Sequence, residues 1–244
     1  MTLLTDSNNS VGIYVPSCNR SENVHDRKLL PNSRFSYVVR KSQEKLYLSE
    51  GCVNVIAVDD EEINSLGKVR QWIIDNAKDD VVIQVDDDVK FLRYVLKETV
   101  SQELTEDEVV GELLRVSQII LDLDLGFAST GMNPDTRRVN REFSFKGITG
   151  GICWFNKKAL KARYERELMK VDADFMLQEL LYNRICIVPM YLGLFAKHDV
   201  NKGGNNVNKT YARLVSDNEY LKTKWGRHYG FDYKSNKTKI NVKR

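Results

Sequence analysis

The order of secondary-structure signals in residues 52–85 constrains the fold of this chain more than any other feature. Residues 52–58 and 81–85 are rich in valine and isoleucine, which is typical of buried strands. Between them, apolar residues recur every three or four positions over residues 66–77, which predicts an amphipathic helix with Ser65 as its N-cap. Strand, helix and strand in this order form a right-handed crossover, and open α/β sheets bind nucleotides at the carboxyl ends of such strands.

Further strands and helices follow from the same reasoning. Residues 98–125 read as an acidic helical pair in which Thr105 starts a capping arrangement. One face of that pair would pack through Val109, Leu113, Val116 and Ile120. The remaining expected elements are strands at 11–15, 143–148, 151–155, 185–188 and 191–195, and helices at 156–169 and 175–182.

Length and composition limit the class of protein. The chain has 244 residues without a linker or repeat, so we expect one domain. No apolar run approaches the roughly 18 residues that a membrane-spanning helix needs. The polar N-terminus lacks the features of a signal peptide, and the four cysteines are widely spaced without a C-x-x-C pair. We therefore expect a cytoplasmic protein, in the host cell if the chain is viral, with reduced cysteines and no membrane partner.

Three consecutive aspartates, Asp86, Asp87 and Asp88, directly follow the predicted strand 81–85. Carboxylates this close repel one another, and a divalent cation removes that cost. Mg²⁺ and Mn²⁺ prefer carboxylate oxygens and keep substrate phosphates in their other coordination positions, so the pattern favours a metal–diphosphate site. The alternative is a solvated acidic turn that caps a helix beginning near Lys90.

Basic charge is concentrated towards the carboxyl-terminal end. The net charge is +3, but from Lys197 onward twelve Lys/Arg residues stand against four Asp/Glu, which leaves the first 196 residues at −5. Residues 234–244 are polar and cationic without apolar periodicity. This stretch fits either a solvated tail or an arm that contacts phosphates.

The order and spacing of these segments resemble GT-A glycosyltransferases. The similar features are residues 11–20, the helix start Gly67-Lys-Val-Arg70, the apolar strand that ends in Asp-x-Asp, and a later Gly-Gly segment. They span nearly the whole chain. Residues 65–72 together with 84–89 are particularly similar to the TET-associated glycosyltransferases, enzymes of bacteriophages that sugar oxidised or hydroxymethylated DNA bases.

This resemblance implies a fold and an activity. The fold would be a single GT-A, Rossmann-like α/β domain over residues 1–244, with a mixed central sheet flanked by helices. Residues of about 11–130 would bind the nucleotide sugar, about 131–233 would form the acceptor and catalytic half, and 234–244 would be a basic tail. The activity would be metal-dependent transfer of a hexosyl or pentosyl group from a nucleotide sugar, in particular a UDP-sugar, to a hydroxyl group, with Mn²⁺ or Mg²⁺ as cofactor.

The resemblance also implies roles in donor binding. Arg70 would reach the phosphates of the nucleotide sugar or the strand-end carboxylates. Asp86 would contact the ribose or sugar, Asp87 would lie beside it, and Asp88 would be the direct metal ligand. The other positions implied for the donor are Pro16, Ser17, Asn19 and Arg20 around the nucleobase and ribose, Asp59 in support of the base, and Gly67 at the helix start.

His198 is the second candidate for a metal ligand. It follows the predicted strand 191–195 and precedes a glycine-containing loop that could fold over phosphates with its backbone N–H groups and Lys202. GT-A enzymes commonly supply a late histidine to the metal, and the resemblance implies that role here. A structural or surface histidine is the alternative.

An inverting transfer needs a carboxylate that takes the proton of the acceptor hydroxyl. Asp172 and Asp174 resemble the Glu-Asp-x-Asp segment of inverting GT-A enzymes, in which the position of Asp172 is the base. Val171 stands where the family usually has glutamate, so the choice between the two aspartates stays open. The alternative is that either one caps the helix 175–182.

A further group of residues would form the part of the site that binds the donor sugar and the acceptor. Gly150 and Gly151 would let the backbone approach the donor sugar, and Trp154 would offer an apolar face, unless this segment is simply a tight hairpin. Arginines in a polar loop, with the basic tail, would contact DNA phosphates, and an aromatic residue would stack on a flipped base. These residues are Arg137, Arg138, Arg141, and Phe143 or Phe145.

Other functions remain as alternatives. Nucleotidyltransfer normally uses a Gly-rich loop with Lys or Arg after the first strand, which residues 17–20 lack. A nucleic-acid-binding module would use the basic tail and leave the three aspartates with a structural role. Within glycosyltransferases, the acceptor would be a glycan or small molecule in place of DNA. The oligomeric state is not predicted.

Overall fold

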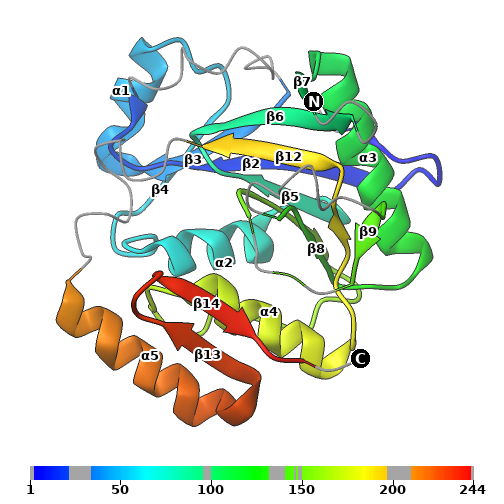
Figure 1. Cartoon of the computed structure of the whole chain (residues 1–244). Helices are drawn as coiled ribbons and strands as arrows, with labels where there is room; N and C mark the ends of the chain where they lie inside the picture. The colour runs from blue at the N-terminus through cyan, green and yellow to red at the C-terminus, as the bar shows by residue number, and fades with distance from the viewer. Residues whose placement is uncertain are drawn as a thin grey trace.

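A central mixed sheet of seven strands organises the chain, with helices on both of its faces (Figure 1). The computed structural model describes residues 3–21, 34–95, 100–131, 141–145, 147, 150–196 and 210–242. Four parallel strands stand in the spatial order β4 (Val55–Val58), β3 (Ser36–Arg40), β2 (Ser10–Pro16) and β5 (Val81–Val85). This architecture confirms the expected α/β class with a mixed sheet.

The sheet continues beyond β5 with antiparallel pairing. Strand β10 (Ile152–Asn156) runs antiparallel to β5, β8 (Phe127–Ser129) runs antiparallel to β10, and the short β1 (Leu3–Leu4) pairs with the start of β2. A second sheet of three antiparallel strands has the order β12 (Leu192–Ala196), β6 (Val89–Val95) and β7 (Val100–Glu103). Strands β9 (Phe143–Ser144) and β11 (Val188–Pro189) form a separate pair.

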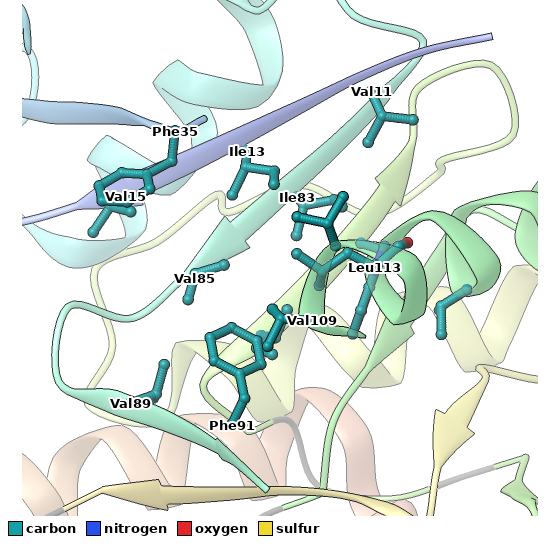
Figure 2. Close-up of a cluster of buried hydrophobic side chains, with 14 of the residues drawn as sticks. Val11, Ile13, Val15, Phe35, Ile83, Val85, Val89, Phe91, Val109 and Leu113 are labelled. Atoms are coloured by element: carbon teal, nitrogen blue, oxygen red, sulfur yellow. The ribbon is translucent and has the colours of Figure 1, made fainter. Parts of the chain in front are cut away.

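Alternation along the strands divides the core between the two faces of the sheet. On β5, Val81, Ile83 and Val85 belong to the core on the face covered by α3 (Glu106–Asp122). Figure 2 shows Ile83 and Val85 on the same side as Val109 and Leu113 of that helix. Val82 points to the opposite face, covered by α2 (Leu66–Asn76) and α4 (Val171–Tyr182). Side chains on both faces are buried because alternate residues of a strand point in opposite directions.

The remaining elements lie at the ends of these layers. A 3₁₀ turn at Lys41–Gln43 leads into α1 (Glu44–Ser49), which packs on the α3 face through Tyr47. After α4, the helix α5 (Tyr211–Trp225), a 3₁₀ turn at Gly226–His228 and the hairpin of β13 (Tyr229–Asp232) and β14 (Lys237–Ile240) pack against α2 and α4 (Figure 1). Among the described residues, no helix is long and apolar enough to cross a membrane.

Elements defined by local signals agree with the sequence. Strand β5 covers the predicted residues, and Ser65 caps α2 by accepting a hydrogen bond from the backbone N–H of Lys68. Thr105 and Glu108 form the capping box of α3, whose predicted apolar face is buried. The acidic pair of helices over 98–125 is wrong, because the first part is strand β7 and only α3 is helical. Residue 90 lies in strand β6, so no helix begins there.

The helix expected over residues 156–169 is wrong, and side chains from distant parts of the chain explain why. After one turn at Asn156, backbone N–H groups of this segment donate to side-chain oxygens and not to carbonyls four residues earlier. Glu179 accepts two of these bonds and Gln178 accepts one. Gln71 and Asp217 accept two more, and the donors are Lys161, Ala162, Arg163, Tyr164 and Met169.

Part of the stretch expected to be a basic tail, residues 234–244, belongs to a β-hairpin. Residues 237–240 form β14, which pairs with β13, and the partly buried Ile240 and Val242 pack against the core on the α4 face. The positive charge is carried on the outer side of this strand, where Lys237 and Lys239 are exposed. The cationic stretch is therefore a structural hairpin with a basic outer edge.

Candidate functional site

The carboxyl ends of β2 and β5 meet where the order of strands in the sheet reverses. Strands β3 and β4 lie on one side of β2, and β5, which follows them in the chain, lies on the other side of β2. Open α/β sheets bind ligands at such a switch point, outside the carboxyl ends of the strands. Here the loops are residues 17–20 after β2 and 86–88 after β5.

Asp87 fastens these two loops together. Its carboxylate accepts a hydrogen bond from Ser17 Oγ at 2.5 Å and an ion pair from Arg20 NH1 at 2.7 Å. The Ser17 hydroxyl also lies 2.7 Å from the hydroxyl of Tyr47 on α1. The side chain of Asp87 is only 5% exposed, and both carboxylate oxygens are engaged by protein groups.

Arg20 extends this contact to Asp88. Its NH1 group lies 3.2 Å from Asp88 Oδ2, and the side chain of Asp88 is 20% exposed. Burial alone would lower the pKa of Arg20, but the carboxylates of Asp87, Asp88 and Asp86 outweigh it and raise that pKa. One arginine thus balances part of the negative charge of the three aspartates.

Asp86 lies on the other side of the same loop. Its backbone N–H donates to the carbonyl of Gly151 at 2.7 Å, and its carboxylate accepts from Arg70 NH2 at 2.9 Å. Burial, with repulsion from Asp172 and the neighbouring aspartates, raises the pKa of Asp86 to about 6, although Arg70 acts against this shift. With Asp172, four carboxylates stand here against Arg20 and Arg70, so the site holds more negative charge than these two arginines neutralise.

Arg70 on α2 is buried and joins two carboxylates from different elements. It pairs with Asp86 after β5 and, through NH1, with Asp172 on α4. Gln84 Nε2 donates to the carbonyl of Arg70 at 2.8 Å and fixes this turn of α2 to β5. Of the two partners predicted for Arg70, the described residues provide the strand-end carboxylate.

Asp172 and Asp174 occupy different environments in the first turn of α4. The helix begins at Val171, and the N-cap residue Lys170 makes no side-chain cap bond, so capping by an aspartate is wrong. The side chain of Asp172 is 35% exposed and lies beside Arg70. Asp174 is 3% exposed and accepts from three side chains, which are Trp225 Nε1 at 2.7 Å, Lys224 Nζ at 3.0 Å and Gln178 Nε2 at 3.1 Å.

These contacts predict a structural role for Asp174. We expect Asp174→Ala to lower the free energy of unfolding by about 2–4 kcal/mol, because it removes a buried carboxylate that accepts from the indole N–H of the partly buried Trp225 and pairs with Lys224. Asp75→Ala, which removes the exposed pair with Arg163, should cost less than about 1 kcal/mol. Urea unfolding of both variants measures the difference, and equal small losses would contradict the assignment.

Close packing requires glycine at position 150 but not at position 67. A side chain on Gly150 would put its Cβ 2.5 Å from the carbonyl oxygen of Thr130, so only glycine fits between the end of β8 and the start of β10. A Cβ on Gly67 would lie 3.4 Å from Val171, where α2 approaches the start of α4. The expected exposed face of Trp154 is wrong, because its side chain is fully buried and its Nε1 donates to the carbonyl of Leu113.

The other donor-side positions lie along the same sheet edge. Pro16 ends β2, and Asn19 adopts a positive φ of 55°. Gln43, before α1, holds Asn19 by accepting from its N–H at 2.9 Å and donating to its Oδ1 at 2.6 Å. Asp59 is exposed after β4, three strand spacings from β5, or about 14 Å.

Several predicted site residues lie outside the described residues, and these are Arg137, Arg138, Lys202 and His198. Arg141 is described and exposed just before β9. Phe143 contacts the Tyr191 ring edge-to-face and lies under Arg115, whereas Phe145 is exposed. The described part of the chain holds no group of three or more His, Cys, Asp or Glu side chains that could bind a metal.

Sequence reasoning missed three residues that shape the site. Tyr47 and Gln43 position the loop after β2, and Trp225 holds Asp174. No periodicity or motif marks them, because each acts through a partner more than 20 residues away.

The sequence comparisons give no match, whereas the structural comparison does. No protein-family model matches the chain, and no curated protein matches it. Glucosyl-3-phosphoglycerate synthase from Mycobacterium tuberculosis, solved with Mn²⁺, UDP-glucose and phosphoglyceric acid, is similar at a TM-score of 0.49 and 11% identity. That alignment covers 96% of this chain and 87% of the synthase.

Two further similar structures are larger than this chain. The mannosyltransferase PcManGT from Pyrobaculum calidifontis, solved with GDP-mannose and Mn²⁺, has a TM-score of 0.45 and 13% identity, over 75% of this chain and 55% of its own. TarS from S. aureus, solved with UDP-GlcNAc, has a TM-score of 0.41 and 13% identity, over 75% of this chain and 57% of its own. The chain thus spans less than two thirds of these two relatives.

Proposed function

We propose that this chain is a GT-A glycosyltransferase that transfers a sugar from a nucleotide sugar, in particular a UDP-sugar, to a hydroxyl acceptor. The observation that carries the proposal is that the loops after β2 and β5 meet at the switch point of the sheet, where three aspartates lie beside the loop after β2. Arg70 also links a partly exposed carboxylate, Asp172, to Asp86. The proposed donor site therefore lies next to Asp172, the candidate general base.

The donor would lie along the carboxyl edge of the parallel strands. The nucleobase and ribose would contact the loop after β2, at Pro16, Ser17, Asn19 and Arg20, with Asp59 supporting the base from β4. The sugar would lie near Asp86, Gly150 and Gly151, and Lys202 would approach the diphosphate. Asp87 would support this site by holding the loops after β2 and β5 together, and Gly67 would lie at the start of α2 beside it.

The residues present fit a hard divalent cation, Mn²⁺ or Mg²⁺. Such ions use one or two carboxylates and complete their coordination with substrate phosphates and water, so they need no cluster of three protein ligands. Four carboxylates, those of Asp86, Asp87, Asp88 and Asp172, stand against the two arginines Arg20 and Arg70, and this excess of negative charge favours an added cation. Asp88 would hold it, with His198 as a further ligand. When bound, the ion neutralises negative charge that develops on the departing diphosphate.

Asp172 would be the general base, and the transfer would invert the anomeric configuration. Its carboxylate is partly exposed at the site, whereas the oxygens of Asp174 are occupied by Trp225 and Lys224. Arg70 pairs with both Asp172 and Asp86 and so fixes the orientation of one carboxylate relative to the other. A base must be charged and within reach of the acceptor hydroxyl to take its proton.

The acceptor in this proposal is a 5-hydroxymethylpyrimidine base in DNA. Helix α5 and the hairpin carry exposed lysines, and Lys224 of α5 bonds Asp174 only two residues from Asp172. A basic surface therefore adjoins the helix that carries the candidate base, which suits contact with phosphates. Arg137, Arg138 and Arg141 would extend these contacts.

A DNA-transfer assay tests this acceptor. We expect sugar transfer to duplex DNA that carries 5-hydroxymethylcytosine, and none to unmodified duplex. Transfer should fall steeply with salt, because binding releases counterions from the phosphates. In Lys237→Gln with Lys239→Gln, the salt slope should fall by about two, since each phosphate contact contributes about one. These exposed substitutions keep the hairpin, whereas deletion of 234–244 would remove β14.

Two outcomes would contradict the DNA acceptor. One is equal transfer to the free hydroxymethylated nucleoside and to the duplex. The other is an unchanged salt slope in the double variant, with Arg163→Gln as the control for loss of an exposed cation elsewhere. Either result would leave a glycan or a small molecule as the acceptor class.

A further inference from the structure

Arg20 occupies a position between the two aspartates where a cation is expected. Its NH1 group contacts Asp87 Oδ1 at 2.7 Å and Asp88 Oδ2 at 3.2 Å. The guanidinium is largely buried, so little water competes for either contact. A single positive group therefore bridges both carboxylates.

The contacts of Arg20 with Asp87 and with Asp88 are the two arms of this bridge, and they differ in length and exposure. Asp87 is nearly buried, and its other oxygen accepts from Ser17, so its place is fixed by the protein. Asp88 is more exposed, and its contact with Arg20 is 0.5 Å longer. The arm to Asp88 is the one that another cation would displace, because it is the longer and more solvated of the two.

We propose that Arg20 substitutes for the divalent cation at Asp88 when the donor is absent, and that the ion binds there by displacing this arm alone. The inference rests on the proposed metal role of Asp88. The bond between Arg20 and Asp87 persists, so the loop after β2 stays in place while Asp88 turns to the ion. Arg20 is then a competitor that offsets part of the negative charge at Asp88 and lowers the affinity of the site for metal.

If Arg20 competes with the metal ion at Asp88, removing the charge of Arg20 should raise the affinity of the site for Mn²⁺. Without donor, Arg20→Gln should bind Mn²⁺ about five-fold more tightly than the unmodified chain, the effect expected for loss of one competing, partly exposed ion pair. Arg20→Lys keeps the charge and should stay within about two-fold of the unmodified chain. Titration of Mn²⁺ followed by electron paramagnetic resonance of the free ion gives these affinities without enzyme activity.

Two control variants separate the outcomes. Arg163→Gln removes an exposed arginine that pairs with Asp75 away from the site, and its Mn²⁺ affinity should be unchanged. Asp88→Asn should lose the binding. Unchanged or weaker binding in Arg20→Gln, with binding that Asp88→Asn removes, would overturn this inference and leave the proposed function standing. Absence of any binding that depends on Asp88 would overturn the metal site of the proposed function and the inference with it.

Discussion

Replacing Asp172 with asparagine is expected to lower turnover by a factor on the order of 10²–10⁴, with little change in donor affinity. The amide keeps the size of the side chain and removes the group that takes the proton. Arg70 loses one of its two carboxylate partners but keeps Asp86, so α2 and α4 should stay in place. Steady-state kinetics of sugar transfer, with donor binding measured separately by calorimetry, tests the split between turnover and affinity.

Asp174→Asn is the matched control for this prediction. Its carboxylate is buried against Trp225 and Lys224, so the variant should lose stability and keep turnover per folded molecule. The reverse pattern, with turnover lost only in Asp174→Asn, would contradict the assignment of Asp172. A base on one side of the sugar implies inversion, so a retained anomeric configuration in the product, seen by NMR, would remove the role from both aspartates.

Asp88→Asn is expected to abolish sugar transfer while the chain stays folded. The substitution removes the carboxylate proposed to hold the cation and one negative charge from a site that already carries several. Asp88 is partly exposed and is not the residue that fastens the two loops, so its loss should cost little stability. Transfer rates across a Mn²⁺ titration, with thermal unfolding of the same sample, give both quantities.

Asp87→Asn is the variant to compare with Asp88→Asn. Asp87 binds Ser17 and Arg20, so this variant should loosen the loop after β2 and weaken donor binding, with some transfer left at high donor concentration. Normal transfer by Asp88→Asn with full Mn²⁺ dependence would contradict the metal assignment. The two neighbouring aspartates therefore separate the metal role from the positioning role.

The sequence predicts those parts of the fold that depend on local signals. Strand β5, the Ser65 cap of α2 and the Thr105 capping box all follow from residues within four positions of one another. Strand β3 was missed although Tyr37, Val38 and Val39 are β-rich, because the run is short and ends at polar residues. Local patterns thus predict the crossover and the position of the acidic loop after β5.

Distant partners explain why the rest could not be predicted. The segment 156–169 has helical periodicity, but Glu179, Gln178, Gln71 and Asp217 accept its backbone N–H groups from elsewhere in the chain. The same holds for the hairpin, because residues 234–244 carry too few apolar positions to reveal that Ile240 and Val242 pack against the core. Tertiary contacts override the local pattern in both cases.

In the candidate site, too, local patterns predict some features and contacts between distant residues decide the others. The Asp-x-Asp pattern places carboxylates at the end of β5, but only the fold shows that Asp87 is held by Ser17 and Arg20. Asp172 and Asp174 are two residues apart on a helix, so they point to different sides, and helix α5 decides which of them is buried. Trp154 is in a strand buried on both faces, where alternation gives no sign of which side faces a ligand.

Calorimetric titration of UDP and GDP into the unmodified chain, in Mn²⁺ and in EDTA, tests the central claim most directly. The claim is that the loops after β2 and β5 bind a nucleoside diphosphate through a divalent cation at Asp88. We expect one of the two nucleotides to bind in Mn²⁺ and to bind at least about ten-fold more weakly in EDTA or in Asp88→Asn, which corresponds to about 1.4 kcal/mol. No binding of either nucleotide in Mn²⁺, or equal binding in EDTA, would contradict the account.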